Sequence, residues 1–286
     1  MIINKQTRKF LEDWIIPQGY QRIIQRMKPE RSPRVSVQDS EIMARNAKFR
    51  DLYAGRRCFV IGNGPSLKQQ NLDVLKDDVT IAMNYFFKHP VLGLWQPTAY
   101  CVAENPENYT PRIIQDMKSG IAEINSQAIF IPLSVKQLNE QYHIYPKDRT
   151  SYLNITGGPI YDWPIKKRII NLTSVLPGPP STAHMAIMVA LYLGCSPIYL
   201  IGLDSDYLAH RSYIEHFYPT PEEERHNVEN LLTYSYKTLM DAALKLWMTY
   251  EALRDIALQD NKEIYNAGVG GFLDVFPRVK FESLFR

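Results

Sequence analysis

Residues 56–75 read RRCFVIGNGPSLKQQNLDVL and pass from an apolar strand, through a glycine turn, into a stretch that predicts an amphipathic helix. In the turn, Gly62 ends the strand and Gly64 lets backbone approach a ligand, while Pro65 and Ser66 open the helix and Ser66 is able to cap it. Open backbone N–H groups at such a helix start attract anions. The stretch therefore predicts a strand–turn–helix unit with an anion site at the turn.

Two common phosphate-binding motifs do not fit this turn. Leu67 stands where the dinucleotide fingerprint needs its third glycine, and no Gly-Lys-Ser/Thr follows to make a Walker A loop. The alternative to an anion site is a plain strand–helix turn that binds no ligand. Asn63 favours a ligand, because its short amide lies beside open N–H groups and suits a nucleotide phosphate or ribose.

The chain from Arg57 onward alternates short apolar runs with helical patterns, which is typical of a doubly wound, mostly parallel α/β sheet. The strands are predicted at 58–61, 79–83, 98–103, 128–132, 198–201 and 263–266. The helices are predicted after Ser66, Ser181 and Glu222, and the segment from about 227 to 259 has a helical pattern that fits one helix or two. We predict one Rossmann-like nucleotide-binding domain over residues 56–286. The irregular, aromatic residues from about 134 to 180 predict an inserted lid.

Residues 1–55 predict a helical extension with a basic excess. Residues 1–57 carry thirteen Lys and Arg against six Asp and Glu, although the whole chain has a formal net charge of only +3. The small net charge argues against nucleic acid as a partner. The extension mixes basic and large apolar residues, so it could lie on an anionic membrane surface or pack on its own protein or on a partner subunit.

The three cysteines, Cys58, Cys101 and Cys195, lie far apart in apolar contexts without metal-ligand spacing, so we predict buried free thiols. The first residues lack the apolar core of a signal peptide, and no run approaches a spanning helix. These patterns predict a cytoplasmic protein, with the extension as a means of peripheral attachment to the membrane.

Polar residues follow several of the predicted strands. Asn63, Asn84 and Asn105 each come at the carboxyl end of one of three successive strands. In open α/β sheets, ligands bind outside these ends. Each asparagine alone is typical of a turn, but the three together predict a neutral, hydrogen-bonding rim around a ligand.

A second group of polar residues surrounds the fourth predicted unit, PPSTAHMAIMVALYLGCSPIYLIGLDSDYL. Ser181 and Thr182 offer hydroxyl and N–H groups at a helix start, and the strand that follows delivers Asp204, Asp206 and Tyr207 to the same edge. Two aspartates two residues apart could bind a metal, or they could simply be solvated acids at a strand end. The sequence leaves both interpretations open.

His216 is the candidate general base. It lies in the segment HRSYIEHFYPT, with Tyr213, Phe217 and Tyr218 around it. A partly desolvated histidine titrates near neutral pH and takes protons readily, although an aromatic-flanked histidine is also a common structural residue. We interpret His184, on the helix after Ser181, as a packing residue or as one that supports a ligand-contacting residue from behind.

The order and spacing of GNGPSL, AMNYFF, ENPENY, PPSTAHMAIMVALYLGCSPIYLIGLD, YIEH and EIYNAGVGGFLDVF resemble the bacterial sialyltransferases of glycosyltransferase family 42. They also resemble the broader MptE-like group, which is similar to archaeal 6-hydroxymethylpterin diphosphokinase. The resemblance covers about residues 57–277. Thr182 departs from it, because the sialyltransferases usually have glycine after the serine.

The resemblance to the sialyltransferases implies a role for several of these residues. Asn63 and Asn84 would contact the phosphate and ribose of a CMP-activated sugar, while Asn105 and Ser181 would hold the sugar carboxylate. Tyr213 would support the leaving phosphate, with Tyr207 a candidate for the second tyrosine that the family uses there. His216 would deprotonate the acceptor hydroxyl.

These roles imply an inverting, CMP-sugar-dependent glycosyltransferase that moves sialic acid or a related keto-acid sugar onto a glycan in surface polysaccharide synthesis, without a metal or other cofactor. A lipid-linked acceptor would suit a peripheral enzyme. The alternative is an ATP- and Mg²⁺-dependent diphosphokinase, and a nucleotide-sugar-binding protein without turnover is a third. The sugar, the acceptor, the linkage and a homo-oligomeric state are left open.

Overall fold

The computed structural model describes residues 36–163, 168–206, 208–209, 216–218 and 235–285. The chain divides into two units, Met1–Arg34 and Val35–Arg286, and all described residues belong to the second. The predicted extension therefore lies outside the described residues except for its last part. That part packs with the sheet, since Asn46 Nδ2 donates hydrogen bonds to the carbonyl oxygens of Tyr152 and Leu172.

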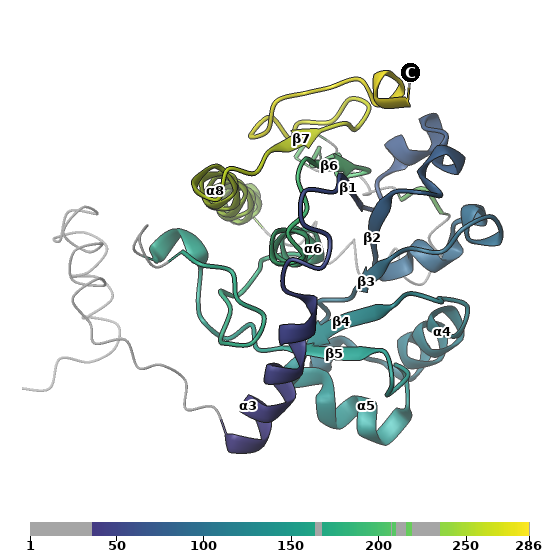
Figure 1. Ribbon diagram of the computed structural model, residues 1–286, viewed down its shortest axis with the longest axis vertical. Coiled ribbons are helices and arrows are strands. Elements are labelled where there is room, and N and C mark those ends of the chain that lie inside the picture. Colours follow the sequence, from purple (N-terminus) through teal and green to yellow (C-terminus); the bar gives the residue numbers. More distant parts are fainter. Residues whose placement is uncertain (1–35, 164–167, 207, 210–215, 219–234, 286) are drawn as a thin grey trace, which may run out of the picture. The chain divides into compact units, whose positions relative to one another are not determined.

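The described strands form one seven-stranded sheet that is parallel throughout, in the order β5-β4-β3-β2-β1-β6-β7 (Figure 1). The strands are β1 Cys58–Ile61, β2 Val79–Met83, β3 Ala99–Cys101, β4 Ala128–Pro132, β5 Thr150–Leu153, β6 Ile198–Ile201 and β7 Ile264–Asn266. The order reverses between β1 and β6. This reversal is the topological switch point, beside which open α/β sheets bind their ligands.

The α-helices in the described part are α3 Val37–Ala44, α4 Pro111–Ala122, α5 Lys136–Tyr142, α6 Thr182–Tyr192 and α8 Tyr236–Gln259. Among these helices, none is long and apolar enough to cross a membrane. Short 3₁₀ turns make many of the connections: η1 Arg45–Phe49, η2 Pro65–Gln69, η3 Leu72–Leu75, η4 Asn84–Lys88, η5 Pro90–Gly93, η6 Pro106–Asn108, η7 Leu133–Val135, η8 Ile160–Asp162 and η10 Phe281–Phe285.

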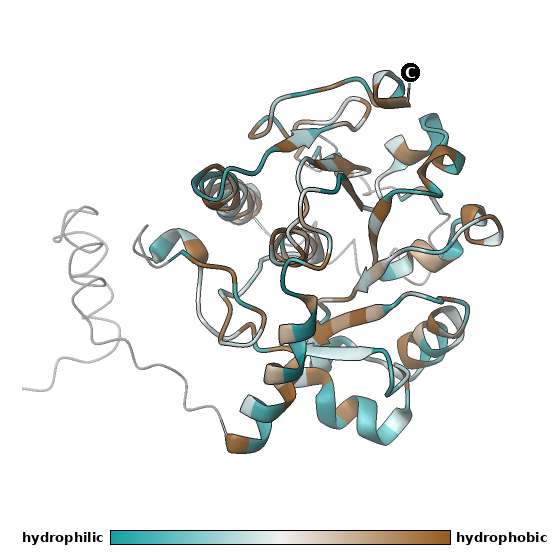
Figure 2. Cartoon of the chain, viewed as in Figure 1, coloured by the Kyte–Doolittle hydropathy of each residue, from teal (hydrophilic) through white to brown (hydrophobic). Residues whose placement is uncertain are grey.

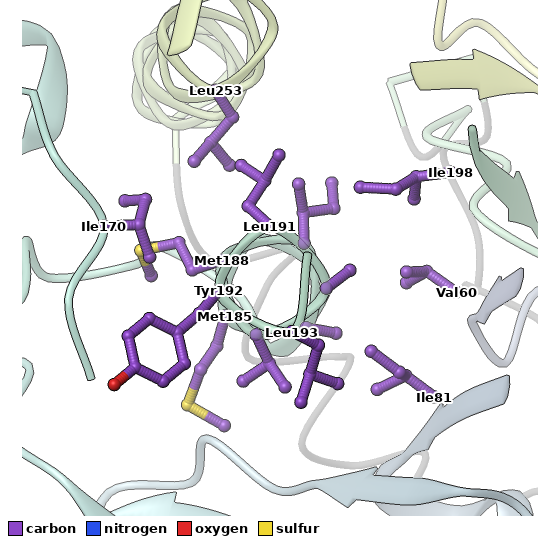
Figure 3. Close-up of a cluster of buried hydrophobic side chains, with 14 of the residues drawn as sticks. Val60, Ile81, Ile170, Met185, Met188, Leu191, Tyr192, Leu193, Ile198 and Leu253 are labelled. Atoms are coloured by element: carbon purple, nitrogen blue, oxygen red, sulfur yellow. The ribbon is translucent and has the colours of Figure 1, made fainter. Parts of the chain in front are cut away.

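The hydrophobic core has one cluster on each face of the sheet. Alternate residues of β1 belong to different clusters, with Cys58 and Val60 in one and Phe59 and Ile61 in the other. On the first face, α6 is buried along its whole length because the sheet covers one side of it and α8 packs against it (Figure 3). Figure 2 shows the consequence, with mostly hydrophobic residues along α6 and a hydrophilic α5.

The sequence predicted six of these strands, and four have the predicted bounds. Strand β5 was not predicted, since the run TSYL is short and only every second residue in it is buried. Residues 136–153 supply α5 and the edge strand β5, so the interpretation of 134–180 as irregular is wrong there. The cysteines are buried free thiols, as predicted.

The predicted helix after Ser66 is also wrong. The chain makes two short 3₁₀ turns there, η2 and η3, separated by an extended Gln70. The backbone of Gln70 is extended instead of helical, because its side-chain Nε2 donates a hydrogen bond to the carbonyl oxygen of Ala267, 2.8 Å away. Asn71 then begins a new turn, since its side chain accepts a hydrogen bond from the backbone N–H of Asp73.

Candidate active site at the carboxyl ends of the strands

The glycine turn after β1 holds a carboxylate of the protein itself. The backbone N–H of Ser66 donates to Asp204 Oδ2 at 3.0 Å, and the Ser66 hydroxyl donates to Asp204 Oδ1. Burial raises the pKa of Asp204, and the two hydrogen bonds from Ser66 oppose that rise. The predicted anion site at this turn is thus filled by Asp204, and Ser66 donates to that carboxylate where the sequence predicted a capping acceptor.

The two glycines of the turn are needed because chain segments after β1 and β6 pack together here. A Cβ atom on Gly62 would overlap the carbonyl oxygen of Gly202 and the side chain of Leu203. A Cβ atom on Gly64 would lie 2.5 Å from Asp204 Oδ2. The sequence predicted close approach of a ligand, whereas the structure shows close approach of the neighbouring segment.

Asn63, between these glycines, carries a buried side-chain oxygen without a hydrogen-bond partner among the described residues. Its Nδ2 donates to the carbonyl oxygen of Met83 at 3.1 Å, and its own carbonyl oxygen accepts from the N–H of Phe217 at 3.0 Å. Its Oδ1 is buried and has no hydrogen-bond partner among the described residues. Because buried polar atoms are nearly always hydrogen-bonded, this oxygen is a candidate acceptor for a hydrogen bond from a ligand.

Asn84 and Thr182 join three elements beside Asn63. Asn84 has a positive φ of 49°, which is rare outside glycine, and Tyr100 holds it there by donating its hydroxyl to the Asn84 carbonyl oxygen at 2.6 Å. The Thr182 hydroxyl donates to Asn84 Oδ1 at 3.0 Å and accepts from the N–H of Ala103 at 3.3 Å. The threonine therefore ties α6 to the ends of β2 and β3.

Ser181 and His184 form a hydrogen-bonded pair at the start of α6. Ser181 Oγ lies 2.7 Å from Nδ1 of His184, and Nε2 lies 3.1 Å from the carbonyl oxygen of Leu246. His184 is fully buried and stacks on Tyr250, with ring centroids 3.9 Å apart. Burial lowers the pKa of His184 to about 3. The imidazole is therefore neutral and too weak a base to activate Ser181 as a nucleophile, although the spacing would suit such a pair.

The buried His184 makes stability depend on pH. Its folded pKa is below its unfolded value, so the unfolded chain binds a proton first, and stability falls as pH drops below about 6.5 towards 3. Between pH 7.5 and pH 5 we expect the native protein to lose about 2 kcal/mol more unfolding free energy than His184→Gln. Urea unfolding of both proteins at the two pH values measures this. The exposed His143, replaced by asparagine, is the control and should keep the native pH dependence. If the native protein and His184→Gln lost the same unfolding free energy between the two pH values, the prediction would be contradicted.

His216 lies beside Asn63 within an aromatic cluster. Its ring stacks on Tyr218 with centroids 5.0 Å apart, and Tyr218 in turn lies 5.8 Å from Tyr85. The Lys88 ammonium sits 4.6 Å from the centroids of both tyrosine rings. The pKa of His216 is lowered mainly by burial and also by the Lys88 charge, while a hydrogen bond with the Asn63 backbone raises it. His216 is thus a half-buried, neutral imidazole at the rim of the sheet.

The remaining predicted residues are not joined to this group. Asn105 is exposed after β3, and its N–H donates to the carboxylate of Glu104 at 3.2 Å. Tyr207 and Tyr213 lie outside the described residues. In the described part of the chain, no three His, Cys, Asp or Glu side chains gather closely enough to hold a metal ion.

The sequence patterns did not single out Lys88 and Tyr85. Both follow Asn84 within the 3₁₀ turn η4, so they come to the site from the end of β2. Their signal in the sequence is the run NYFFK directly after a buried strand. It was overlooked because an exposed lysine after aromatic residues is common on protein surfaces.

Comparison with known proteins gives one family. The family model described as 6-hydroxymethylpterin diphosphokinase MptE-like matches residues 37–210. No curated protein matches the chain.

Several solved structures are similar to it at low identity. One is the sialyltransferase CstII from Campylobacter jejuni in complex with the substrate analogue CMP-3FNeuAc, at 15% identity and a TM-score of 0.46, covering 78% of this chain and 86% of that chain. The sialyltransferase CST-II in complex with trisaccharide acceptor and CMP is similar at 16% identity and a TM-score of 0.46, with the same coverage. The MAf glycosyltransferase from Magnetospirillum magneticum AMB-1 is similar at 16% identity and a TM-score of 0.47; the match covers 87% of this chain but only 39% of that chain.

The parallel sheet, its switch point between β1 and β6 and the polar rim at its carboxyl edge define a Rossmann-like α/β protein. Because the family model matches more than half of the length of the chain, the chain belongs to the MptE-like family.

Proposed function

We propose that the protein is an inverting glycosyltransferase that moves sialic acid or a related keto-acid sugar from a CMP-activated donor to a glycan acceptor. The observation that carries the proposal is the pairing of His216 with Asn63. A neutral, half-buried imidazole contacts the backbone of an asparagine whose side-chain oxygen is buried and lacks a partner among the described residues. A general base and a ligand-binding atom therefore meet at the sheet edge where such folds bind ligands.

The proposed reaction is a single displacement. The bond between the anomeric carbon and the CMP phosphate breaks while the acceptor oxygen bonds to that carbon from the opposite side, which inverts its configuration. His216 takes the proton of the acceptor hydroxyl, and CMP leaves with the electron pair of the broken bond. Asn63 and Asn84 contact the donor nucleotide, and Tyr213 and Tyr207 stay predicted contacts of its phosphate. Lys88, whose ammonium lies over the Tyr218 ring and whose charge acts on His216, would add positive charge on the His216 side of the site.

The membership in the MptE-like family favours a second candidate, an ATP- and Mg²⁺-dependent diphosphokinase acting on a pterin-like alcohol. It would use Asp204 and Asp206 near the metal. The contacts of Asp204 disfavour this role, since both of its oxygens accept hydrogen bonds from Ser66. Binding a metal through Asp204 would require these bonds to be weakened or replaced.

A thermal-shift comparison of CMP, CDP, ATP, UDP and GDP, each with and without Mg²⁺, tests the proposal. A ligand that binds only the native state raises the melting temperature in proportion to its occupancy. We expect stabilisation by CMP that does not depend on Mg²⁺. Stabilisation by ATP only in the presence of Mg²⁺ would overturn the proposal and support the diphosphokinase.

The charge of Lys88 predicts the direction of a pH effect. Its ammonium helps to lower the pKa of His216, so removing it in Lys88→Met should raise that pKa. If turnover needs neutral His216, the pH at which turnover reaches half its maximum should move upward. The release of CMP from a CMP-sialic acid donor, measured from pH 5 to 8, gives this midpoint. Lys76→Met changes an exposed lysine away from His216 and should leave it unchanged. An unmoved or lowered midpoint in Lys88→Met would count against the role of His216.

A further inference from the structure

We propose that His184 fixes the hydroxyl of Ser181 so that Ser181 accepts a hydrogen bond from the sugar nucleotide instead of donating one. The group of the ligand that faces Ser181 is then a hydroxyl or an amide N–H, and the donor carboxylate is held elsewhere. This inference rests on the proposed function, because it specifies how the same site recognises its ligand. It assigns Ser181 a different contact from the one that the family resemblance implies, and it makes His184 a positioning residue.

The contact on the buried side of the imidazole fixes the tautomer of His184. Nε2 of His184 lies 3.1 Å from the carbonyl oxygen of Leu246, and a carbonyl oxygen can only accept. Nε2 must therefore carry a hydrogen. A neutral imidazole carries one N–H, so Nδ1 has a lone pair and accepts from Ser181 Oγ, 2.7 Å away. The hydroxyl proton of Ser181 is thus directed at His184.

The surroundings of His184 hold this arrangement in place. The ring has no exposed surface and stacks on Tyr250 at 3.9 Å. Complete burial opposes the doubly protonated form, in which Nδ1 would donate. If the Ser181 hydroxyl turned away towards a ligand, Nδ1 would become a buried acceptor without a partner. A buried acceptor left without a donor is costly, so the ligand meets Ser181 through the lone pairs of Oγ.

Nitrogen NMR of the native protein, with ¹⁵N-labelled histidine, tests the tautomer and the hydroxyl directly. His184→Gln identifies the resonances, and Ser181→Ala gives the shift of Nδ1 without a hydrogen bond. We expect His184 to carry its hydrogen on Nε2 and Nδ1 to keep its hydrogen-bonded shift when CMP-3FNeuAc is added. A hydrogen on Nδ1, or a change of Nδ1 to the Ser181→Ala value on binding, would overturn the inference.

Calorimetric titration with CMP-3FNeuAc and with its carboxylate methyl ester gives a second test. We expect Ser181→Ala to weaken both ligands about tenfold, the effect of one hydrogen bond, and Ser181→Thr, which keeps the hydroxyl, to restore both. If Ser181 donated to the carboxylate, Ser181→Ala would weaken the acid but not the ester. If the native protein bound neither CMP nor CMP-3FNeuAc, the proposed function would fail, and the inference with it.

Discussion

Replacing Gly62 with alanine is expected to lower the free energy of unfolding by about 3 kcal/mol, the upper range for overpacking a close-packed interior. The added Cβ would overlap the carbonyl oxygen of Gly202 and the side chain of Leu203, and would lie 2.9 Å from the carbonyl carbon of Gly202. Relief requires β1 and β6 to move apart, because a carbonyl oxygen fixed at a strand end cannot rotate away. Urea unfolding followed by circular dichroism measures the change.

Gly93→Ala is the matched control for this experiment. Gly93 is exposed, and a Cβ atom there would meet nothing within 4 Å. We expect its midpoint to stay unchanged or to rise slightly, since alanine restricts the unfolded chain more than glycine does. Equal unfolding midpoints for the two variants would show that the segments after β1 and β6 are not packed as closely as the structure indicates.

Replacing His216 with asparagine is expected to reduce turnover by about 10²–10⁴-fold, the usual contribution of a general base. Asparagine retains a polar amide but cannot accept the proton of an acceptor hydroxyl at neutral pH. The affinity for CMP should change little, because the role assigned to His216 concerns the acceptor. Turnover is measured as CMP release from a CMP-sialic acid donor in the presence of a glycan acceptor, and affinity by calorimetry.

His143→Asn serves as the control for this loss. His143 is exposed at the end of α5 with a positive φ of 52°, a conformation that asparagine also adopts readily. It should keep full turnover. Native turnover in His216→Asn, with CMP still bound, would remove His216 from the reaction. A variant that no longer unfolds cooperatively would be replaced by His216→Gln before the comparison is made.

Much of the sheet could be predicted because short apolar runs bounded by turn residues are a local signal. The runs at 58–61 and 79–83 are buried along their whole length, so burial and sequence agree without any knowledge of neighbours. Strand β5 lacks that signal, since a strand at the sheet edge is covered on fewer sides and keeps polar residues. The prediction of a helix after Ser66 was wrong for the opposite reason. The local sequence pattern there is helical, but the hydrogen bond from Gln70 to Ala267 overrides it.

The candidate site was only partly predictable. The sequence placed Asn63, Asn84 and Thr182 at neighbouring strand and helix ends, and the structure joins Thr182 to Asn84 by a hydrogen bond. Asn105 does not join them, because its own exposed turn holds it beside Glu104. Lys88 was missed, since only the folded chain brings its ammonium over the Tyr218 ring.

By itself, the sequence determined the class of fold and the edge of the sheet at which the polar residues gather. The spacing of apolar residues and the turn residues between the apolar runs carry that information, because each strand buries its own residues and each turn has its own geometry. Only the tertiary structure decided what the glycine turn holds. Ser66 and Asp204 are 138 positions apart, and their hydrogen bonds form because β1 and β6 are neighbours in the sheet. The carboxylate of Asp204, in the segment that follows β6, therefore fills a site that the local sequence alone would assign to a ligand.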